Sequence, residues 1–214
     1  MSKISLDKYL NEKFPLLALK QPLFYNFPVG IRFDLGGDLE VCEGRIEQCY
    51  TRSYTLFNEI NKVGDKLFVV LFVDSCSEFP ISKSESEIFK VFKNYFYGID
   101  FSANVYKDVL DYRYKEPGDV DDTKTYRFYI SCKVEEIDIK EMIVAKLNQD
   151  IGNNPCLIGD LYLINQSNNT IFNIYDDRGL DIVANSKDTL IQVYKKYKNW
   201  ILEYDREIIE QRFS

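Results

Sequence analysis

The longest continuous apolar run in the chain is the seven-residue segment LFVVLFV at residues 67–73. A strand can be apolar on both faces only where other elements cover the sheet on both sides, so this run predicts a central strand. It is far too short for a membrane-spanning helix, which needs roughly 20 apolar residues. We therefore expect a sheet at the centre of the fold with helices packed on it.

Several other segments show period-two alternation or lie between turn-rich sequences, as strands do. They are residues 31–35, 106–114, 126–134, 161–164, 170–175 and 180–184. The acidic loop KEPGDVDDTK joins the second and third of them and predicts a hairpin. The sequences QSNN and DDRG separate the last three and are typical of a meander. These segments predict a mixed, largely antiparallel sheet.

Four segments carry apolar residues at the three-and-four spacing of a helix face. They are residues 43–63, 84–95, 138–151 and 185–208, the last as one long helix or two. Ser84 with Glu87, and Asp138 with Glu141, can form N-terminal capping pairs, and Gly152 is a stop signal. The fold class is therefore α+β, with the helices packed on the sheet in a single domain over residues 1–214.

The chain contains no histidine. This removes the side chain that serves most catalytic triads, most zinc sites and most general bases near neutral pH. The segment GIRFDLGG has glycines without the spacing of a phosphate-binding loop. The sequence thus points to no catalytic residue, no metal ligands and no cofactor, and it favours a protein that is not an enzyme.

The chain is acidic, with 27 Lys and Arg against 34 Asp and Glu and a net charge of −7. A negative chain repels nucleic acid and anionic membranes and favours a basic partner. The five cysteines are scattered and form no CxxC pair, so we expect free thiols in a reducing compartment. The N-terminal residues lack the apolar stretch of a signal peptide. We therefore expect a cytoplasmic protein that binds another protein and neither nucleic acid nor membrane.

Three stretches in combination resemble a bacterial family known as domain of unknown function 3885. They are LFYN at residues 23–26 with GIRFDLG at 30–36, IYDDRGLDIVANS at 174–186, and WILEYDRE at 200–207. Leu180 stands where the family commonly has a small residue or cysteine. The resemblance covers both ends of the chain, whereas residues 63–146 are assigned by secondary-structure pattern alone. It implies a shared fold and names no reaction.

The same stretches contain a group of charged residues that is either a structural network or a site. Its members are Arg32, Asp34, Asp176, Asp177, Arg178 and Asp181. Gly179 and the aspartates favour a hairpin turn whose side chains bond nearby amides and pair with Arg178. If the strands lie close, Arg32 and Asp34 are expected to meet Asp176, Asp177 or Arg178. The alternative is that the aspartates bind a divalent cation, although their spacing matches no known calcium loop.

Two clusters of carboxylates carry the binding hypothesis. One is the hairpin loop with Glu116, Asp119, Asp121 and Asp122, and the other comprises Glu135, Glu136, Asp138 and Glu141. We expect the loop to project into solvent and to steer a basic partner, and an immunity-type antidote to a nuclease-like toxin is the specific form of this hypothesis. The alternatives are a cation-dependent enzyme using Asp176, Asp177 and Asp181, and a structural or regulatory interaction protein.

Overall fold

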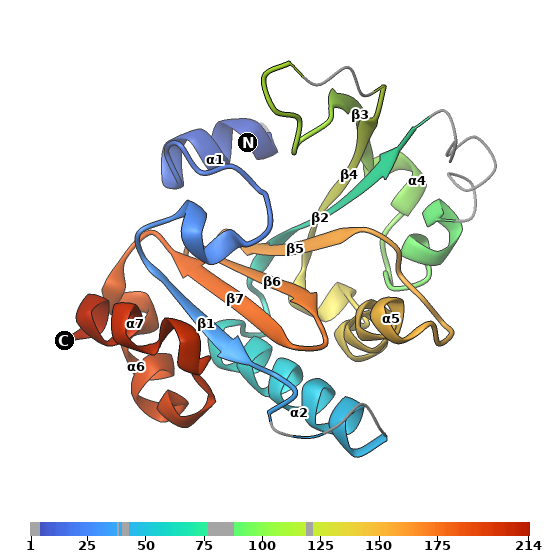
Figure 1. Ribbon diagram of the computed structural model, residues 1–214. Helices are drawn as coiled ribbons and strands as arrows, with labels where there is room; N and C mark the ends of the chain where they lie inside the picture. The colour runs from blue at the N-terminus through green and yellow to red at the C-terminus, as the bar shows by residue number, and fades with distance from the viewer. Residues whose placement is uncertain (1–4, 38, 40–42, 77–87, 119–121) are drawn as a thin grey trace.

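The computed structural model describes residues 5–37, 39, 43–76, 88–118 and 122–214. Its strands form one antiparallel sheet in the order β1-β7-β6-β5-β2-β4-β3 (Figure 1). The strands are β1 (Gly30–Asp34), β2 (Lys66–Ser75), β3 (Tyr106–Asp111), β4 (Lys124–Lys133), β5 (Asp160–Asn165), β6 (Thr170–Asp176) and β7 (Gly179–Ala184). The expected α+β class and single domain are confirmed, and every strand pairing in the described chain is antiparallel.

Helices cover both faces of this sheet (Figure 1). The α-helices are α1 (Leu6–Lys13), α2 (Glu43–Ile60), α4 (Phe101–Asn104), α5 (Ile139–Ile151), α6 (Lys187–Lys196) and α7 (Arg206–Phe213), and residues 88–93 are also helical. Short 3-10 helices are η1 (Leu23–Asn26), η2 (Val134–Glu136), η3 (Lys198–Trp200) and η4 (Glu203–Asp205). Among the described residues, no helix combines the length and the apolar character needed to cross a membrane.

The apolar run forms the central strand β2, which lies between β4 and β5. Its alternate residues Leu67, Val69 and Leu71 belong to the core beneath α2 and α5. Phe68 and Val70 belong to a second core, on the face covered by α1 and the segment that follows it. We call these the helical face and the N-terminal face. The prediction of a strand covered on both sides is confirmed.

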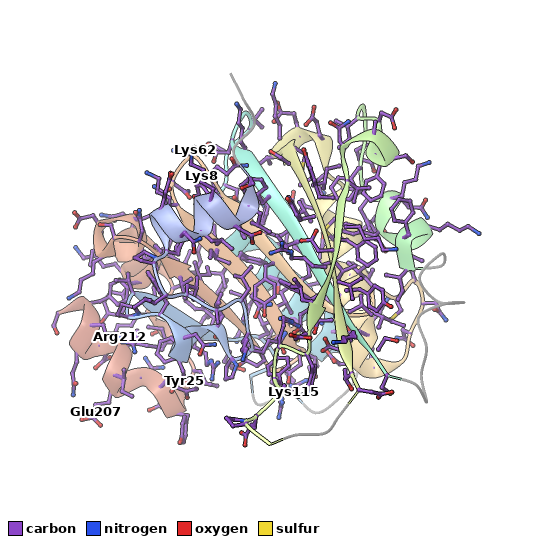
Figure 2. All side chains as sticks on the ribbon, turned by 90° about the horizontal axis from the view of Figure 1, so that it is seen from above. Lys8, Tyr25, Lys62, Lys115, Glu207 and Arg212 are labelled. Atoms are coloured by element: carbon purple, nitrogen blue, oxygen red, sulfur yellow. The ribbon has the colours of Figure 1, made fainter. Side chains whose placement is uncertain are left out.

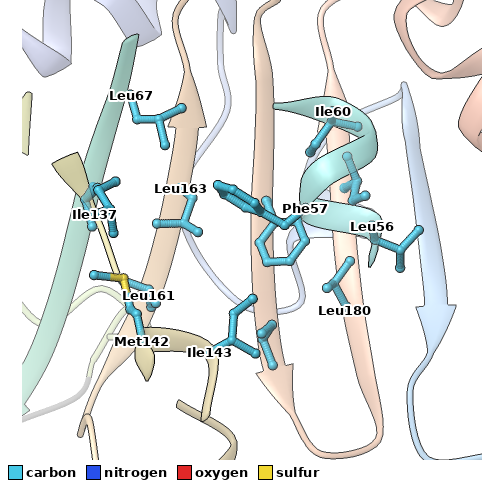
Figure 3. Packing of buried hydrophobic residues seen from close by; sticks show 14 of the residues in the cluster. Leu56, Phe57, Ile60, Leu67, Ile137, Met142, Ile143, Leu161, Leu163 and Leu180 are labelled. Carbon is cyan, nitrogen blue, oxygen red and sulfur yellow. The ribbon is translucent and has the colours of Figure 1, made fainter. Parts of the chain in front are cut away.

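The core of the helical face is formed largely by α2 and α5 packing on the meander (Figure 3). Phe57 from α2 packs edge-on against Phe172 of β6, with ring centroids 5.7 Å apart. Met142 and Ile143 of α5 lie beside Leu161 of β5. These helices and strands come from separate parts of the chain, so this core brings residues 43–60 together with residues 139–176.

The boundaries of α5 follow from its terminal residues. The side chain of Asp138 accepts a hydrogen bond from Glu141 N at 3.2 Å, and Gly152 takes the left-handed conformation that ends the helix. Both were predicted.

Residues 88–95 also carry their expected buried residues, Ile88, Phe92 and Tyr95. The predicted capping pair Ser84 and Glu87 lies outside the described residues.

One helix prediction needs correction. The first long helix ends at Ile60, because Lys62, Gly64 and Asp65 form a turn into β2, and Val63 is 84% exposed instead of buried. The C-terminal segment, expected as one long helix or two, is two α-helices, α6 and α7, because the backbone leaves helical geometry at Ile201 to bridge to Phe33 of β1. The backbone of Ile201 and Leu202 thus bonds to the edge of the sheet, whereas in a continuous helix it would bond within the helix.

The cysteines in the described residues, Cys49, Cys76, Cys132 and Cys156, are free, as expected. Burial raises the pKa of Cys49 to about 11 and also raises the pKa of Cys132. Both therefore stay protonated near neutral pH and act as small core residues.

We expect Gly159→Ala to destabilise the protein by at least about 2 kcal/mol. Gly159 has φ +118°, and a Cβ there would lie 2.3 Å from the carbonyl oxygen of Phe72 in β2. Gly64→Ala is the matched control, since Gly64 has φ +91° but no atom within 4 Å of the added carbon, and it should cost about 1 kcal/mol. Urea denaturation of both variants measures the difference, and equal losses would contradict the tight approach of Gly159 to β2.

Candidate functional site

The segments that suggested the family converge at the β1 edge of the sheet. Strand β1 pairs with β7, which places Arg32 opposite Asp181. η1 packs on β7 at the N-terminal face, and the C-terminal segment closes the outer edge of β1 through a bond from Leu202 N to Arg32 O of 3.0 Å. Tyr25 and Asp205, which are 180 residues apart in the chain, therefore meet around one arginine.

Arg32 is buried and forms a bidentate ion pair with Asp181. Its Nε donates to Asp181 Oδ1 at 2.8 Å and its Nη2 donates to Oδ2 at 3.0 Å. The backbone N–H of Phe24 in η1 donates to the same Oδ2 at 2.9 Å. Asp205 brings a second carboxylate to within 3.5 Å of Arg32 Nη1. These contacts satisfy a charge pair that would be costly to bury alone.

Aromatic rings enclose the guanidinium group. It lies 4.7 Å from the ring centre of Tyr25 and 4.9 Å from that of Tyr175. The Tyr25 hydroxyl donates to Asp205 Oδ1 at 2.6 Å, and partial burial together with this bond raises the pKa of Tyr25 to about 12. Burial lowers the pKa of Arg32, but the bonds to Asp181 outweigh it, so the arginine stays charged. We call Tyr25, Arg32, Tyr175, Asp181 and Asp205 the Arg32 cluster.

The remaining charged residues of the predicted group pair with other arginines. Asp34 binds Arg52 at 3.2 Å and Asp177 binds Arg45 at 2.8 Å, both from α2. In the β6–β7 turn, Arg178 Nε donates to Asp176 Oδ2 at 2.8 Å and Arg178 N to Asp176 Oδ1 at 2.8 Å.

The expectation that Arg32 or Asp34 meets Asp176, Asp177 or Arg178 through its side chain is therefore wrong. The antiparallel register sets Arg32 opposite Asp181 and Asp34 opposite Gly179, and α2 supplies arginines that the sequence pattern did not connect to this turn. Asp176, Asp177 and Asp181 each pair with a different arginine, so their carboxylates do not converge on a common point. Within the described ranges, no group of three or more Cys, Asp or Glu side chains is arranged to hold a metal ion.

Three members of the Arg32 cluster were not predicted from the sequence, namely Tyr25, Tyr175 and Asp205. A signal was present, because Tyr25 lies in LFYN, Tyr175 in IYDDRG and Asp205 in WILEYDRE, next to residues that were selected. Asp205 was missed because residues 185–208 were expected to be helical, and an aspartate outside the apolar face of a helix is expected to be solvated. It is 1% exposed.

Lys146 of α5 was also missed, and it is 1% exposed. Its Nζ donates to Gln149 Oε1 at 3.0 Å, and no carboxylate of the described residues lies within ion-pair distance. Burial lowers the pKa of Lys146, while Asp150 and Asp160 oppose the shift. The surrounding sequence MIVAKL is apolar on every side of the helix, which is the signal of a fully buried helix.

The two acidic clusters differ in how their carboxylates are used. In the hairpin loop, Glu116 and Asp122 are exposed, whereas Asp119 and Asp121 lie outside the described residues. In the second cluster, Glu135 accepts from Gly64 N at 2.8 Å and Glu136 from Lys133 N at 2.7 Å, and Asp138 caps α5. Three of the four carboxylates of the second cluster therefore serve local structure, so the binding hypothesis rests on the hairpin loop.

We expect Arg32→Ala to destabilise the protein by about 3 to 5 kcal/mol, because it leaves the Asp181 carboxylate buried without its cation. Arg178→Ala is the control, since this ion pair with Asp176 involves a side chain 74% exposed and should cost less than about 1 kcal/mol. Chemical denaturation measures both. Similar small losses would show that the Arg32 cluster does not hold the β1 edge together.

We expect Lys146→Met to stabilise the protein by about 1 kcal/mol at neutral pH, because it removes a buried charge without a carboxylate partner. Burial lowers the folded-state pKa below the ordinary 10.5, so the unfolded chain holds the proton more tightly. Between the folded-state pKa and 10.5, the wild type therefore gains stability as the pH rises, and the stability advantage of the methionine variant should shrink.

Denaturation between about pH 7 and about pH 10 tests this expectation. Lys140→Met, on the exposed side of the same helix, should change stability little at either pH. A destabilised Lys146→Met variant would mean that the ammonium group has a partner that supports folding.

Comparison with known proteins confirms the family that the sequence suggested. Residues 6–205 match the family model described as Domain of unknown function (DUF3885). The chain is also similar to the Bacillus subtilis (strain 168) protein described as "Uncharacterized protein YnaE", with 25% identity over 219 residues that cover 94% of this chain and 99% of that protein. No solved structure matches the chain. The family match spans the whole sheet and the Arg32 cluster, and the chain therefore belongs to the DUF3885 family.

Proposed function

We propose that this protein binds another protein, and that the partner adds a basic, extended segment to the β3 edge of the sheet. The observation that carries the proposal is that β3 is the outermost strand and presents apolar side chains beside an acidic loop. Addition of a strand to an exposed sheet edge is a common way for proteins to bind extended segments.

The two edges of the sheet differ in how they are covered. β1 is covered by the C-terminal segment, through Leu202 and the bridge from Phe33 to Ile201. β3 pairs with β4, and within the described chain no other strand pairs with it. Tyr106 and Val109 on β3 are 48% and 54% exposed. An edge that combines unpaired backbone with exposed apolar residues favours pairing with another chain.

The charge beside this edge favours a basic partner. Glu116 and Asp122 lie in the loop that joins β3 to β4, and both are exposed. Asp111 at the end of β3 is also exposed, although Lys124 pairs with it at 2.7 Å. With a chain charge of −7, these carboxylates would attract a basic segment and raise its association rate, an effect that salt weakens.

An antidote to a toxin is the specific form of this proposal. An immunity-type protein covers the active site of its toxin, and a nuclease-like active site is basic because it binds phosphate groups. The acidic loop and the net charge support such a complex. A neighbouring gene for a large secreted toxin would add independent support, and its product would be the first partner to test.

The experiment compares Val109→Lys with Val63→Lys, which place the same charge at two exposed valines (Val109 54%, Val63 84%). Figure 2 shows that Lys62, beside Val63, lies far from Lys115 in the loop after β3. Each variant and the wild type are immobilised, extract of the native cell is passed over them, and the retained proteins are identified. We expect a basic protein that the wild type and Val63→Lys retain and Val109→Lys does not.

Charge reversal then tests the role of the loop. With the recovered partner purified, Glu116→Lys with Asp122→Lys should slow association by about tenfold at low salt and less at physiological salt. Dissociation should change little, because the loop carboxylates lie at the rim. Equal retention by the two valine variants, with circular dichroism showing both folded, would remove the β3 edge from the binding surface.

A further inference from the structure

The N-terminal face contains a pocket of about 370 Å³ between α1, residues 17–20 and strands β2, β3 and β4. Its walls are mostly apolar, from Leu10, Leu17, Leu19, Phe72 and Leu110. Pockets of roughly 300 to 1,000 Å³ with such walls bind whole small molecules, so this one has room for a single large side chain. The exposed residue Ala18 also lines it, so the pocket opens to solvent.

The pocket reaches the outermost strand of the sheet. Leu110 of β3 lines it and packs against the core of the N-terminal face. Tyr106 lies on the same face of β3, because it stands opposite Tyr129, which belongs to that core. Within the described chain β3 pairs only with β4. The pocket is therefore continuous with the edge at which we propose that the partner binds.

A strand added outside β3 would bring side chains to this pocket. Side chains alternate between the two faces of a strand, and opposite side chains on neighbouring strands lie about 5 Å apart. Every second side chain of the added strand would thus lie on the N-terminal face, beside Tyr106 and Leu110. The others would lie beside Val109, which stands opposite Tyr126 on the helical face. The pocket and Val109 therefore contact different side chains of the same partner strand.

The charges at the pocket favour an uncharged side chain. The charged groups in and beside it are Asp7, Lys20, Asp108, Arg113, Arg127 and Asp160. Three are positive and three are negative, so they balance. Arg127 binds both Asp7, at 2.6 Å, and Asp108. A charged side chain that entered the pocket would lose its hydration where no net opposite charge compensates the loss, whereas an apolar side chain has no such cost.

The inner wall of the pocket is already fixed in the free protein. Phe72 comes from the central strand β2, and the guanidinium carbon of Arg113 lies 4.0 Å from its ring centre. Arg113 Nη2 donates to Asp160 at 2.6 Å, and Nη1 donates to the carbonyl oxygen of Leu19. A preformed site loses little conformational freedom on binding, which favours affinity.

We propose that this pocket receives a large apolar side chain, such as phenylalanine, from the strand that adds to β3. We call this side chain the anchor. The inference rests on the proposed function and names a residue type that the partner must carry. Backbone hydrogen bonds along β3 would give affinity for extended segments in general, whereas the pocket would select one side chain. The basic residues of the partner lie outside the pocket, beside the acidic loop.

The test uses an extended peptide of alternating threonine and lysine, in which the central threonine is replaced by phenylalanine, alanine or glutamine. The three peptides carry the same charge. Fluorescence anisotropy with the full chain should show that the phenylalanine peptide binds at least about tenfold more tightly than the alanine peptide, as expected for burial of an aromatic side chain. The glutamine peptide should bind no more tightly than the alanine peptide.

Matched variants assign this preference to the pocket. Ala18→Trp fills the pocket from an exposed position and should reduce the preference for phenylalanine over alanine to less than about twofold. Leu16→Trp is the control and should keep the preference, because Leu16 is fully exposed and does not line the pocket. Leu17→Ser removes an apolar wall and should reduce the preference by at least about threefold. Circular dichroism checks that each variant is folded.

Val109→Lys separates the anchor from the edge on which it depends. This variant should weaken the binding of all three peptides alike and leave their order unchanged, because Val109 faces away from the pocket. Equal affinity of the wild type for the phenylalanine and alanine peptides, or a preference that survives in both Ala18→Trp and Leu17→Ser, would overturn the anchor alone. Peptides that bind Val109→Lys as tightly as the wild type would instead contradict strand addition at β3.

Discussion

The ion pair of Arg32 with Asp181 is the interaction on which the arrangement of both chain ends depends. A charged pair in the interior is tolerated only when its remaining donors and acceptors are met. Here Asp181 takes a third bond from the backbone of Phe24, and Arg32 lies between Tyr25 and Tyr175 with Asp205 at 3.5 Å. These partners come from η1, β6 and η4. Satisfying one buried charge therefore fixes where the N-terminal segment and the C-terminal segment lie on the sheet.

This arrangement makes the sheet asymmetric. At the β1 edge, the C-terminal segment takes the place of a further strand, with Leu202 N bonded to Arg32 O and Ile201 bridged to Phe33. In the described chain β3 has no such cover on its outer side. Sheet edges that are left open are usually blunted by charge or used for binding. β3 carries both charged residues and the exposed Val109, so a partner must match a charged edge with an apolar centre.

The sequence predicted those parts of the fold that depend on burial period and on local capping. β2 is apolar on both faces because both faces are covered, and α5 begins at Asp138 and ends at Gly152 because those residues satisfy its termini. The site was predicted only in part: Arg32 and Asp181 were selected, but their pairing depends on strand register, which the period of a single strand does not fix. Asp205 and Lys146 are buried polar residues, whereas the apolar pattern of a helix assigns polar residues to solvent.

The Arg32 cluster also shows how the charged residues of the family segments are used. Both oxygens of Asp181 accept bonds, and each neighbouring aspartate of the turn has an arginine. Asp205 Oδ2 is buried without a hydrogen-bond partner, and the charge of Arg32, 3.5 Å away, compensates it. A network whose groups are largely satisfied rigidifies a fold. The residues first selected for their motif therefore hold the two chain ends on the sheet.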